Sequence, residues 1–459
     1  MTNTPRSDAF VFFGATGDLA YKKIFPALQA MIRRGHLNVP IIGVAKQGWK
    51  VDQLRERIRA SLNEHGGGVD EAAFAKLNSL LGYVDGDYND VETFRELSRV
   101  LGNAKHPVHY LAIPPSLFPV VVKHLAATGA VKDARVIIEK PFGRDLASAK
   151  RLNQTLYEAF EERAIFRIDH YLGKEAVQNL VVFRFANTFL EPIWNRNYIE
   201  SIQITMAESF GVQGRGGFYE EAGAIRDVVQ NHLLQVVGFL AMEPPATTYN
   251  ESIRDELVKV FRQVTPIDPA HLVRGQFNGY RNEPGVKPDS NVETFAAMRL
   301  DIDSWRWADV PFFIRAGKCL PVTETEVMVD FKRPPITKLA HGNDNYVRLR
   351  LTPDLRIAMG VRVKKPGEAM VGEPTELSLL EQPKGDEVGA YERLLVDAML
   401  GDPALFARQD AVEAAWAIVE PALGLTTPVQ AYEPGSWGPA ACEALTRDVG
   451  GWLRPPGSG

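Results

Sequence analysis

Short apolar runs alternate with helix-patterned stretches through residues 1–175, and this alternation limits the possible folds more than any other feature of the chain. The apolar runs are "AFVFFG", "VPIIGVA", "HYLAIPP", "RVIIEKP" and "AIFRID". A helix is predicted after each of the first four, including helices that begin at Val51 and Leu146. Strands separated by helices pair in parallel, because the helix returns the chain to the same end of the sheet. Residues 1–175 are therefore predicted to form a doubly wound α/β domain.

Residues 176–459 lack this alternation. Their apolar runs are "ESIQITMAESFG", "ETFAAMRLDID", "VPFFIRAGK", "EVMVDFKRP", "NYVRLRLTP" and "LRIAMGVRV", and most follow one another without an intervening helix. Alternating strands of this kind are typical of an antiparallel sheet. We predict an α+β domain with a large, mainly antiparallel sheet, one face covered by helices and the other available for a subunit contact.

The charge and cysteine content argue against several functional classes. The net charge is −5 and Lys and Arg form no concentrated block, which argues against nucleic acid or an anionic membrane as the main partner. Only two cysteines occur, Cys319 and Cys442, so no disulfide framework is predicted. The chain shows neither a signal-peptide layout nor a membrane-length apolar run. We expect a soluble protein of the cytoplasm.

The glycine-rich stretch "FVFFGATGDLA" places Gly14, Gly17 and Ala20 directly after the first strand. Gly14 permits a tight turn, Gly17 lets the backbone approach a pyrophosphate, and the following helix offers unpaired N–H groups. The spacing is GxxGxxA rather than GxGxxG, and a plain strand-to-helix turn is the alternative. The position after the first strand favours a Rossmann-type dinucleotide-binding domain.

Lys46 follows the second strand, where dinucleotide-binding domains often carry an acid for the ribose 2′-hydroxyl. An ammonium at this position suits the 2′-phosphate of NADP, although a solvated loop lysine would look the same in the sequence. One ammonium also holds a phosphate less firmly than a bidentate guanidinium. NADP is the predicted coenzyme, and NAD remains possible.

Two further groups of polar residues follow predicted strands. In "VIIEKPFG", Glu139 and Lys140 end a buried strand, where charge is costly unless a ligand or partner uses it. In "FRIDHYLGKE", an acid, an imidazole, a phenol and an ammonium crowd together, which packing alone does not explain. Both stretches are interpreted as parts of a site.

The stretch "EEAGAIRDVVQNHLLQVVGFL" predicts one long helix with His232 in its apolar stripe. Such a residue is either a satisfied core histidine or a general base oriented by a carboxylate. Asp227 lies about 140° round an α-helix from His232, so we favour a partner on another element. Cys319 in "FFIRAGKCL" is interpreted as a small buried hydrophobe rather than a nucleophile.

Together, GATGDLA, EKPFG, RIDHYLGKE, "ESFGVQGRGGFYEEAGAIRDVVQNHLLQ" and "PFFIRAGKCL" resemble the glucose-6-phosphate dehydrogenase family, and the resemblance covers nearly the whole chain. It implies oxidation of glucose 6-phosphate to 6-phosphogluconolactone with hydride transfer to NADP. It also implies His232 as the catalytic base and Asp169 as the carboxylate that orients it. A homodimer or homotetramer is implied, and no metal site is predicted.

The resemblance assigns two further sets of residues. The substrate-binding positions it implies are Lys140, His170, Tyr171, Lys174, Glu208, Asp227 and Lys318. The coenzyme-side positions it implies are Gly14, Thr16, Gly17, Asp18, Leu19, Lys23, Lys46, Ala112, Pro114, Pro115, Glu139 and Lys140.

Three positions depart from the family pattern. Thr323 stands where a second basic residue is common, Thr352 where a glutamine often touches the sugar, and Lys46 where arginine is usual. Loss of one charge-assisted contact costs about 1.5–3 kcal/mol, so phosphate recognition is expected to be weaker. A dehydrogenase acting on another sugar or sugar phosphate is one alternative. A non-catalytic sensor of sugar phosphate or coenzyme is another, and a base such as His232 argues against it.

Overall fold

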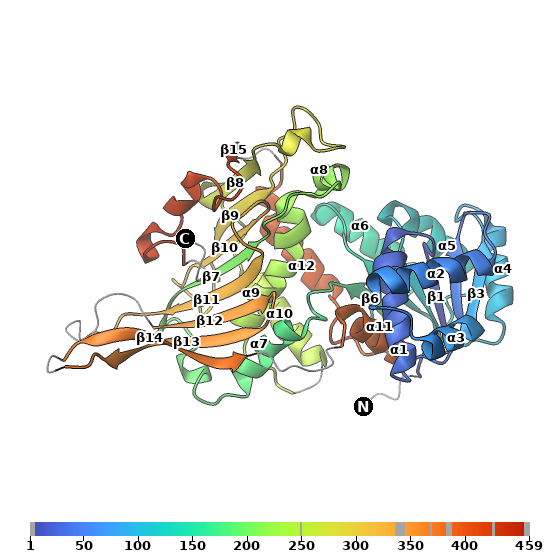
Figure 1. Cartoon of the computed structure of the whole chain (residues 1–459), viewed down its shortest axis with the longest axis horizontal. Coiled ribbons are helices and arrows are strands. Elements are labelled where there is room, and N and C mark those ends of the chain that lie inside the picture. Colours follow the sequence, from blue (N-terminus) through green and yellow to red (C-terminus); the bar gives the residue numbers. More distant parts are fainter. Residues whose placement is uncertain are drawn as a thin grey trace. The chain divides into compact units, whose positions relative to one another are not determined.

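A computed structural model describes residues 5–247, 250–335, 345–367, 370–381, 388–424 and 427–453 (Figure 1). The chain divides into two compact units, each built from separate segments. The first comprises Met1–Lys174, Ala246–Asp255 and Glu387–Glu413, and the second comprises Glu175–Pro245, Glu256–Asp386 and Ala414–Gly459. The boundary proposed after residue 175, which would separate two whole domains, remains a prediction.

The first unit is built on a six-stranded parallel sheet, which confirms the predicted α/β class. The strand order is β3-β2-β1-β4-β5-β6. In sheets with this strand order, dinucleotides bind beyond the carboxyl ends of the strands. The site lies between β1 and β4, where the strand order reverses. The strands are β1 (Ala9–Phe13), β2 (Ile41–Ala45), β3 (Leu81–Asp85), β4 (Pro107–Leu111), β5 (Arg135–Glu139) and β6 (Ile165–Ile168).

Helices connect these strands and cover both faces of the sheet, as a parallel sheet requires (Figure 1). They are the π-helix η1 (Ala20–Ile24), α1 (Phe25–Arg33), α2 (Val51–His65), α3 (Glu71–Leu80), α4 (Val91–Leu101), α5 (Phe118–Ala127) and α6 (Leu146–Tyr157), with 3-10 turns η2 (Pro115–Leu117) and η3 (Glu162–Ala164). The sequence prediction missed α3, β3 and α4. Strand β3 lies at the sheet edge, and only Leu81 and Val84 in it are buried, so it shows no apolar run.

A helix from far along the chain completes the core of the first unit. In α11 (Ala390–Leu400), Leu394, Leu395 and Met399 are fully buried and share a cluster with residues of α1 and β6. The backbone N–H of Ser7 donates to the carbonyl of Met399 at 2.8 Å. The α/β fold of this chain therefore depends on residues almost 400 positions after its first strand.

The second unit contains a nine-stranded sheet of order β14-β13-β12-β11-β7-β10-β9-β8-β15. Pairs β10–β7 and β15–β8 are parallel and the other pairs are antiparallel, which confirms the predicted mainly antiparallel sheet. Strands β8, β14 and β15 were not predicted. The strands are β7 (Ile199–Ala207), β8 (Leu272–Phe277), β9 (Phe295–Leu300), β10 (Phe312–Gly317), β11 (Glu324–Phe331), β12 (Tyr346–Thr352), β13 (Arg356–Lys364), β14 (Gly372–Glu381) and β15 (Val429–Tyr432).

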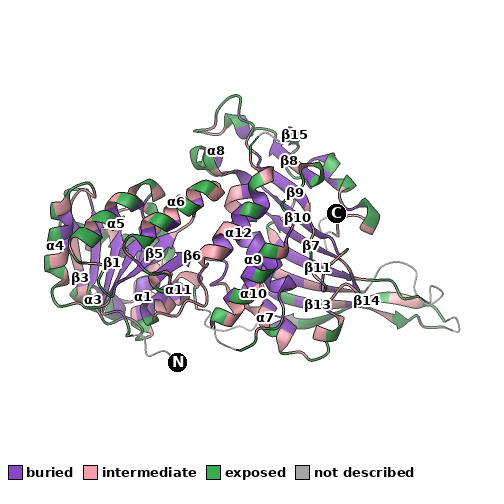
Figure 2. Cartoon of the chain, turned by 180° about the vertical axis from the view of Figure 1, so that it is seen from behind, coloured by how far each residue is buried: buried purple, intermediate pink, exposed green. Residues whose placement is uncertain are grey.

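Helices lie over one face of this sheet (Figure 2). The described helices that lie wholly in the second unit are α7 (Glu175–Phe185), α8 (Gly216–Ala224), the π-helix η5 (Ile225–Leu233) and α9 (Leu234–Ala241), with 3-10 turns η4 (Glu191–Ile193), η6 (Pro269–His271), η7 (Tyr280–Asn282), η8 (Glu420–Ala422), η9 (Ala440–Ala444) and η10 (Arg447–Val449). Helices α10 (Asn250–Gln263) and α12 (Gln409–Val419) begin in segments of the first unit and end in the second. Among the described residues, no helix combines the length and apolar character that a membrane span needs.

The opposite face is partly covered by the C-terminal segment, and its expected use in a subunit contact remains a prediction. Gln203 on β7 donates to the carbonyl of Gly451 at 3.0 Å and accepts from the N–H of Leu453 at 2.8 Å. Arg315 on β10 lies between the rings of Trp437 and Trp452, 4.3 and 4.5 Å from their centroids. The C-terminal segment thus covers the middle of this face.

Candidate functional site

The predicted coenzyme loop has the geometry that its glycines require. Gly14 has φ +81°, and a Cβ built on it would stand 2.3 Å from the carbonyl oxygen of Ala112. The N–H of Gly17 donates to the carbonyl of Gly14 at 2.9 Å, which closes the turn. Gly14 and Ala112 follow β1 and β4, the two strands between which the strand order reverses. The predicted coenzyme positions 14, 17 and 112 therefore meet where this fold class binds dinucleotides.

The other predicted coenzyme residues of the first unit lie around this turn. Thr16 is half-buried before η1, Leu19 packs against the core, and Lys23 is exposed on η1. Asp18 is exposed and pairs with Lys22 at 3.4 Å. Pro114 and Pro115 begin η2 after β4.

Lys46 follows β2 and forms an ion pair at the protein surface. Its Nζ lies 2.6 Å from Oδ2 of Asp87, and its side chain is 69% exposed. The hydrogen bond with Asp87 raises the pKa of Lys46, and N–H donation from Asn89, aided by Lys46, lowers the pKa of Asp87 to about 2. Both groups are therefore ionised at neutral pH.

Glu139 ends β5 among two phenols and a cation. Tyr110 on β4 donates a hydrogen bond to its Oε1, and Tyr391 on α11 is a second hydrogen-bond partner. Burial raises the pKa of Glu139 to about 7, against the opposing effects of the two tyrosines and Lys140. Neither tyrosine was predicted as a site residue. Tyr391 lies more than 200 residues away in sequence, so only the fold brings it to this carboxylate.

The stretch RIDHYLGKE forms a tight turn directly after β6. Asp169 is 2% exposed, and its Oδ1 accepts the N–H of Tyr171 at 3.0 Å. The Nζ of Lys174 lies 3.9 Å from the centroid of the Tyr171 ring. The ring of His170 is nearly parallel to that of Tyr391, with centroids 6.4 Å apart. The turn therefore gathers an imidazole, a phenol and an ammonium, a donor set that can hold a phosphate dianion.

Helix α11 packs against this turn at Gly173. A Cβ built on Gly173 would stand 3.0 Å from the carbonyl oxygen of Ala390 and 3.0 Å from the side chain of Leu394. The close contact explains why the signature carries glycine between Tyr171 and Lys174. Lys140 is half-buried at the end of β5 in the same unit.

The predicted stretch around His232 is helical, but it is not one regular α-helix, because it consists of three segments of different geometry. Gly223 in α8 has φ 63° and ψ 176°, which breaks the helix before Ile225. Residues Ile225–Leu233 form a π-helix and α9 begins at Leu234. Backbone hydrogen bonds in a π-helix join residues i and i+5, so Asp227 and His232 lie about one turn apart. The α-helical angle of about 140° between them does not apply.

His232 is buried, with 4% exposure, in the last turn of η5. Runs of π-helix occur frequently at functional sites, because the wider turn displaces side chains from their α-helical positions. The burial by itself also fits a core histidine, so the role of His232 as a base remains a prediction.

The other predicted substrate contacts of the second unit gather around Tyr219. Lys318 Nζ lies 2.5 Å from Oε2 of Glu208 and 5.2 Å from the centroid of the Tyr219 ring. Burial raises the pKa of Tyr219 well above its usual value, and the charges of Asp227 and Glu208 add to this effect. Tyr219 was not predicted as a site residue, although it belongs to the quoted stretch GRGGFYEEAG. Its burial beside three charged residues is visible only in the fold.

Two residues near Lys318 bear on earlier expectations. Cys319 is half-buried, not fully buried as expected. Burial is the main cause that raises the pKa of its thiol, which argues against a nucleophile. The hydroxyl of Thr323 accepts the N–H of Ser209 at 3.0 Å and lies 2.8 Å from the Ser209 hydroxyl. Thr323 therefore presents a neutral group, already hydrogen-bonded, where a second cation was expected by resemblance.

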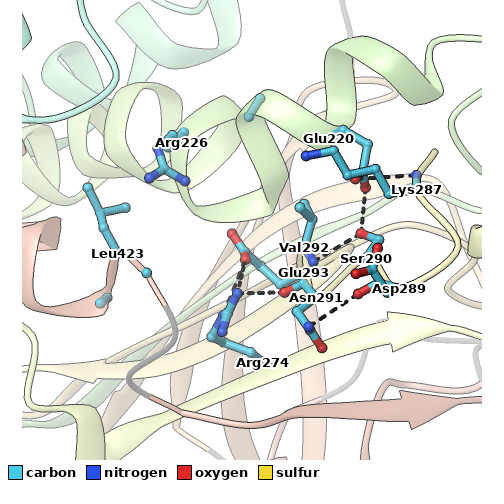
Figure 3. Close-up of a pocket in the computed structure, with 13 residues that line it drawn as sticks. Glu220, Arg226, Arg274, Lys287, Asp289, Ser290, Asn291, Val292, Glu293 and Leu423 are labelled. Atoms are coloured by element: carbon cyan, nitrogen blue, oxygen red, sulfur yellow. Dashed lines mark hydrogen bonds and ion pairs between the residues drawn. The ribbon is translucent and has the colours of Figure 1, made fainter. Parts of the chain in front are cut away.

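A buried ion pair braces the beginning of η5, and Figure 3 shows it beside a cavity of about 320 Å³. Nη2 and Nε of Arg274 lie 2.8 and 3.2 Å from Oε2 of Glu293. The Oε1 atom of Glu293 accepts the N–H of Ile225 at 3.2 Å, and the backbone carbonyl of Glu293 accepts the N–H of Ala224 at 3.0 Å. A Cβ on Gly223 would stand 2.5 Å from Oε1, so this kink admits only glycine. The pair thus fixes the start of the helix that carries Asp227 and His232.

Two family models match the chain, one to each part. The model described as "Glucose-6-phosphate dehydrogenase, NAD binding domain" matches residues 11–179. The model described as "Glucose-6-phosphate dehydrogenase, C-terminal domain" matches residues 181–453.

Curated relatives and solved structures match over nearly the full length. Glucose-6-phosphate 1-dehydrogenase 1 of Mycobacterium tuberculosis is 42% identical over 98% of this chain and 97% of its own. The cytoplasmic isoform of Solanum tuberosum is 41% identical over 96% of this chain and 91% of its own. The crystal structure of the Mycobacterium avium glucose-6-phosphate 1-dehydrogenase superposes with TM-score 0.92 at 43% identity, over 98% of this chain and 99% of that one. A glucose-6-phosphate dehydrogenase in complex with glucose 6-phosphate superposes with TM-score 0.91 at 37% identity, over 99% and 100%.

Proposed function

Because this chain belongs to the glucose-6-phosphate dehydrogenase family, we propose that it oxidises D-glucose 6-phosphate to 6-phospho-D-glucono-1,5-lactone with NADP as coenzyme. The observation that carries the proposal is the 2.5 Å Lys318–Glu208 pair beside Tyr219 and Asp227, on a chain that also has the RIDHYLGKE turn. The group around Lys318 and Glu208 can bind sugar hydroxyls, since it combines donors and acceptors. The RIDHYLGKE turn can bind a phosphate through charge-assisted hydrogen bonds.

In this proposal, His232 takes the proton from the anomeric hydroxyl, and Asp169 holds the imidazole in the required tautomer and stabilises its cationic form. A nicotinamide coenzyme, when bound, would supply the hydride acceptor for C1. His170, Tyr171 and Lys174 bind the phosphate, whose binding free energy holds C1 in position for transfer. Lys140, Glu208, Asp227 and Lys318 contact the sugar hydroxyls.

The turn at Gly14 and Gly17 would receive the coenzyme pyrophosphate, and Lys46 the 2′-phosphate of NADP. The closeness of Ala112 to Gly14 supports this placement, because a side chain at position 14 would obstruct the turn. Assembly as a homodimer or homotetramer and a cytoplasmic location belong to the same proposal. The Solanum tuberosum relative, named a cytoplasmic isoform, supports the location.

A second candidate is oxidation of a free sugar or another sugar phosphate, because Thr323 presents a hydroxyl bonded to Ser209 rather than a cation. Comparison of kcat/KM for glucose 6-phosphate and for glucose, followed as nicotinamide reduction at about 340 nm, separates the two. A preference for glucose 6-phosphate of at least tenfold supports the first candidate, and equal values exclude a phosphate-specific site.

The base assignment is tested with His232→Asn and a matched control, His271→Asn, whose ring is 49% exposed in the same unit. General base catalysis contributes about 10²–10⁴-fold, so His232→Asn should lower kcat by this factor while calorimetry shows unchanged binding of glucose 6-phosphate. His271→Asn should match the parent protein. Asp169→Asn should lower kcat far more than it raises KM. Near-normal turnover by His232→Asn contradicts the assignment.

A further inference from the structure

The loop after β3 holds a carboxylate against the lysine that is proposed to bind the 2′-phosphate. Asp87 Oδ2 lies 2.6 Å from Lys46 Nζ, and both residues belong to the first unit. We propose that Asp87 is a specificity-determining residue that weakens the preference for NADP and allows NAD to serve as coenzyme. This inference rests on the proposed function and adds a residue that the sequence motifs do not include.

The backbone of the Asp87 loop is fixed on both sides of the carboxylate. The N–H of Gly86 donates to the carbonyl of Ala45, the last residue of β2, at 3.0 Å. The Thr93 hydroxyl donates to the carbonyl of Asp87 at 2.8 Å. The carboxylate is oriented as well, because its Oδ1 accepts two hydrogen bonds from Asn89, each of 2.9 Å. Oδ2 is left facing Lys46, so the pair is preorganised, unlike most exposed ion pairs.

The same loop touches the coenzyme turn. The hydroxyl of Tyr88 accepts the N–H of Gly14 at 2.8 Å and donates to the carbonyl of Val44 at 2.9 Å. The residue next to Asp87 is therefore hydrogen-bonded to the first glycine of the proposed pyrophosphate loop. This places Asp87 at the adenosine end of the coenzyme site.

The chemistry of the two coenzymes differs at one position, the 2′-oxygen of the adenosine ribose. In this fold class that oxygen lies beyond the second strand, where an acid accepts the hydroxyl of NAD and a cation pairs with the phosphate of NADP. Strand β2 ends at Ala45 and is followed by a cation, Lys46, while Asp87 supplies an acid from the loop after β3. With NAD, Asp87 accepts the 2′-hydroxyl. With NADP, Lys46 must exchange the carboxylate for the phosphate.

A second acid adds to the negative charge of this loop. Asp85, the last residue of β3, accepts the N–H groups of Gln47 and Gly48 at 3.0 and 2.8 Å. Burial is the largest single effect on Asp85 and raises its pKa, but the backbone N–H groups and the Tyr83 hydroxyl together outweigh it and lower the pKa overall. Asp87 therefore stands beside the Lys46 ammonium, and Asp85 binds the backbone that follows Lys46. The negative charge of these two carboxylates favours the uncharged 2′-hydroxyl over a dianionic phosphate.

The test compares Asp87→Asn with the parent protein. Asparagine retains the acceptor for Asn89 and removes the charge beside Lys46. Calorimetric titration should show an affinity for 2′-AMP about two- to fivefold higher, with affinity for 5′-AMP unchanged or lower. The ratio of kcat/KM for NADP to that for NAD should rise about three- to tenfold. In Lys46→Gln, addition of Asp87→Asn should produce a smaller gain, because no cation is released.

Glu71→Gln is the matched control, since it removes an exposed carboxylate that pairs with Arg59 at 2.7 Å in the same unit. Glu71→Gln should change neither the affinity for 2′-AMP relative to 5′-AMP nor the ratio of kcat/KM for NADP to that for NAD. Asp87→Ser serves as a second variant if asparagine disturbs folding, because its hydroxyl can still accept from Asn89. An unchanged or lower preference for 2′-AMP over 5′-AMP in the folded variant overturns the inference. The nucleotide titration needs no turnover, so failure of the parent protein to reduce either coenzyme counts against the proposed function alone.

Discussion

The Arg274–Glu293 ion pair offers a quantitative test of how the second unit positions the His232 helix. Both side chains are about 5% exposed, and Arg274 also donates to the carbonyls of Thr427 and Asn291, each at 2.9 Å. Arg274→Met leaves Glu293 buried without its cation. Removal of one partner of a buried pair costs about 3–5 kcal/mol, to which the two unpaired carbonyls add. We expect the free energy of unfolding to fall by about 4 kcal/mol or more.

Removal of both charges should be less harmful than the single changes suggest. In Arg274→Met with Glu293→Leu, no buried charge is left unpaired, so the combined loss should be smaller than the sum of the single losses by at least about 2 kcal/mol. The coupling energy isolates the ion pair from the packing of the two side chains.

Urea unfolding followed by tryptophan fluorescence is a suitable assay, because all tryptophans except Trp49 belong to the second unit. Arg196→Met is the matched control, since Arg196 forms an exposed pair with Asp309 at 2.8 Å in the same unit and should cost less than about 1 kcal/mol. A loss below 1 kcal/mol for Arg274→Met, or additive effects in the double variant, would refute the proposal that this pair braces η5.

Two further predictions concern the first unit. Gly14→Ala should weaken coenzyme binding at least tenfold in a titration with NADPH, because the new Cβ would meet the Ala112 carbonyl at 2.3 Å. The control Gly35→Ala, also at positive φ but in open space, should leave coenzyme binding unchanged. Burial raises the pKa of Glu139 to about 7, so its ionisation destabilises the fold of the parent protein as pH rises. The free energy of unfolding of Glu139→Gln should therefore increase relative to that of the parent protein by on the order of 3 kcal/mol between about pH 4.5 and 7. A constant difference in unfolding free energy across that range contradicts the second prediction.

Local patterns in the sequence predicted the two fold classes and most strands of the first sheet. Strands β1, β2, β4, β5 and β6 are buried along most of their length, so each appears as a continuous apolar run. Edge strands such as β3 carry no such run and were missed. The glycine turn was also predictable, because only glycine adopts the backbone conformation at position 14 without strain.

The environment of the site residues was decided by tertiary structure. Tyr391 reaches Glu139 and His170 because α11 packs into the core of the first unit, and Asp87 reaches Lys46 because β3 lies beside β2. Glu293 and the kink at Gly223 likewise meet at the start of the π-helix that carries His232. A sequence pattern records which residues share a face of one element. Contacts between elements, and the pKa shifts they cause, depend on how the chain brings distant segments together, so only the folded structure determines them.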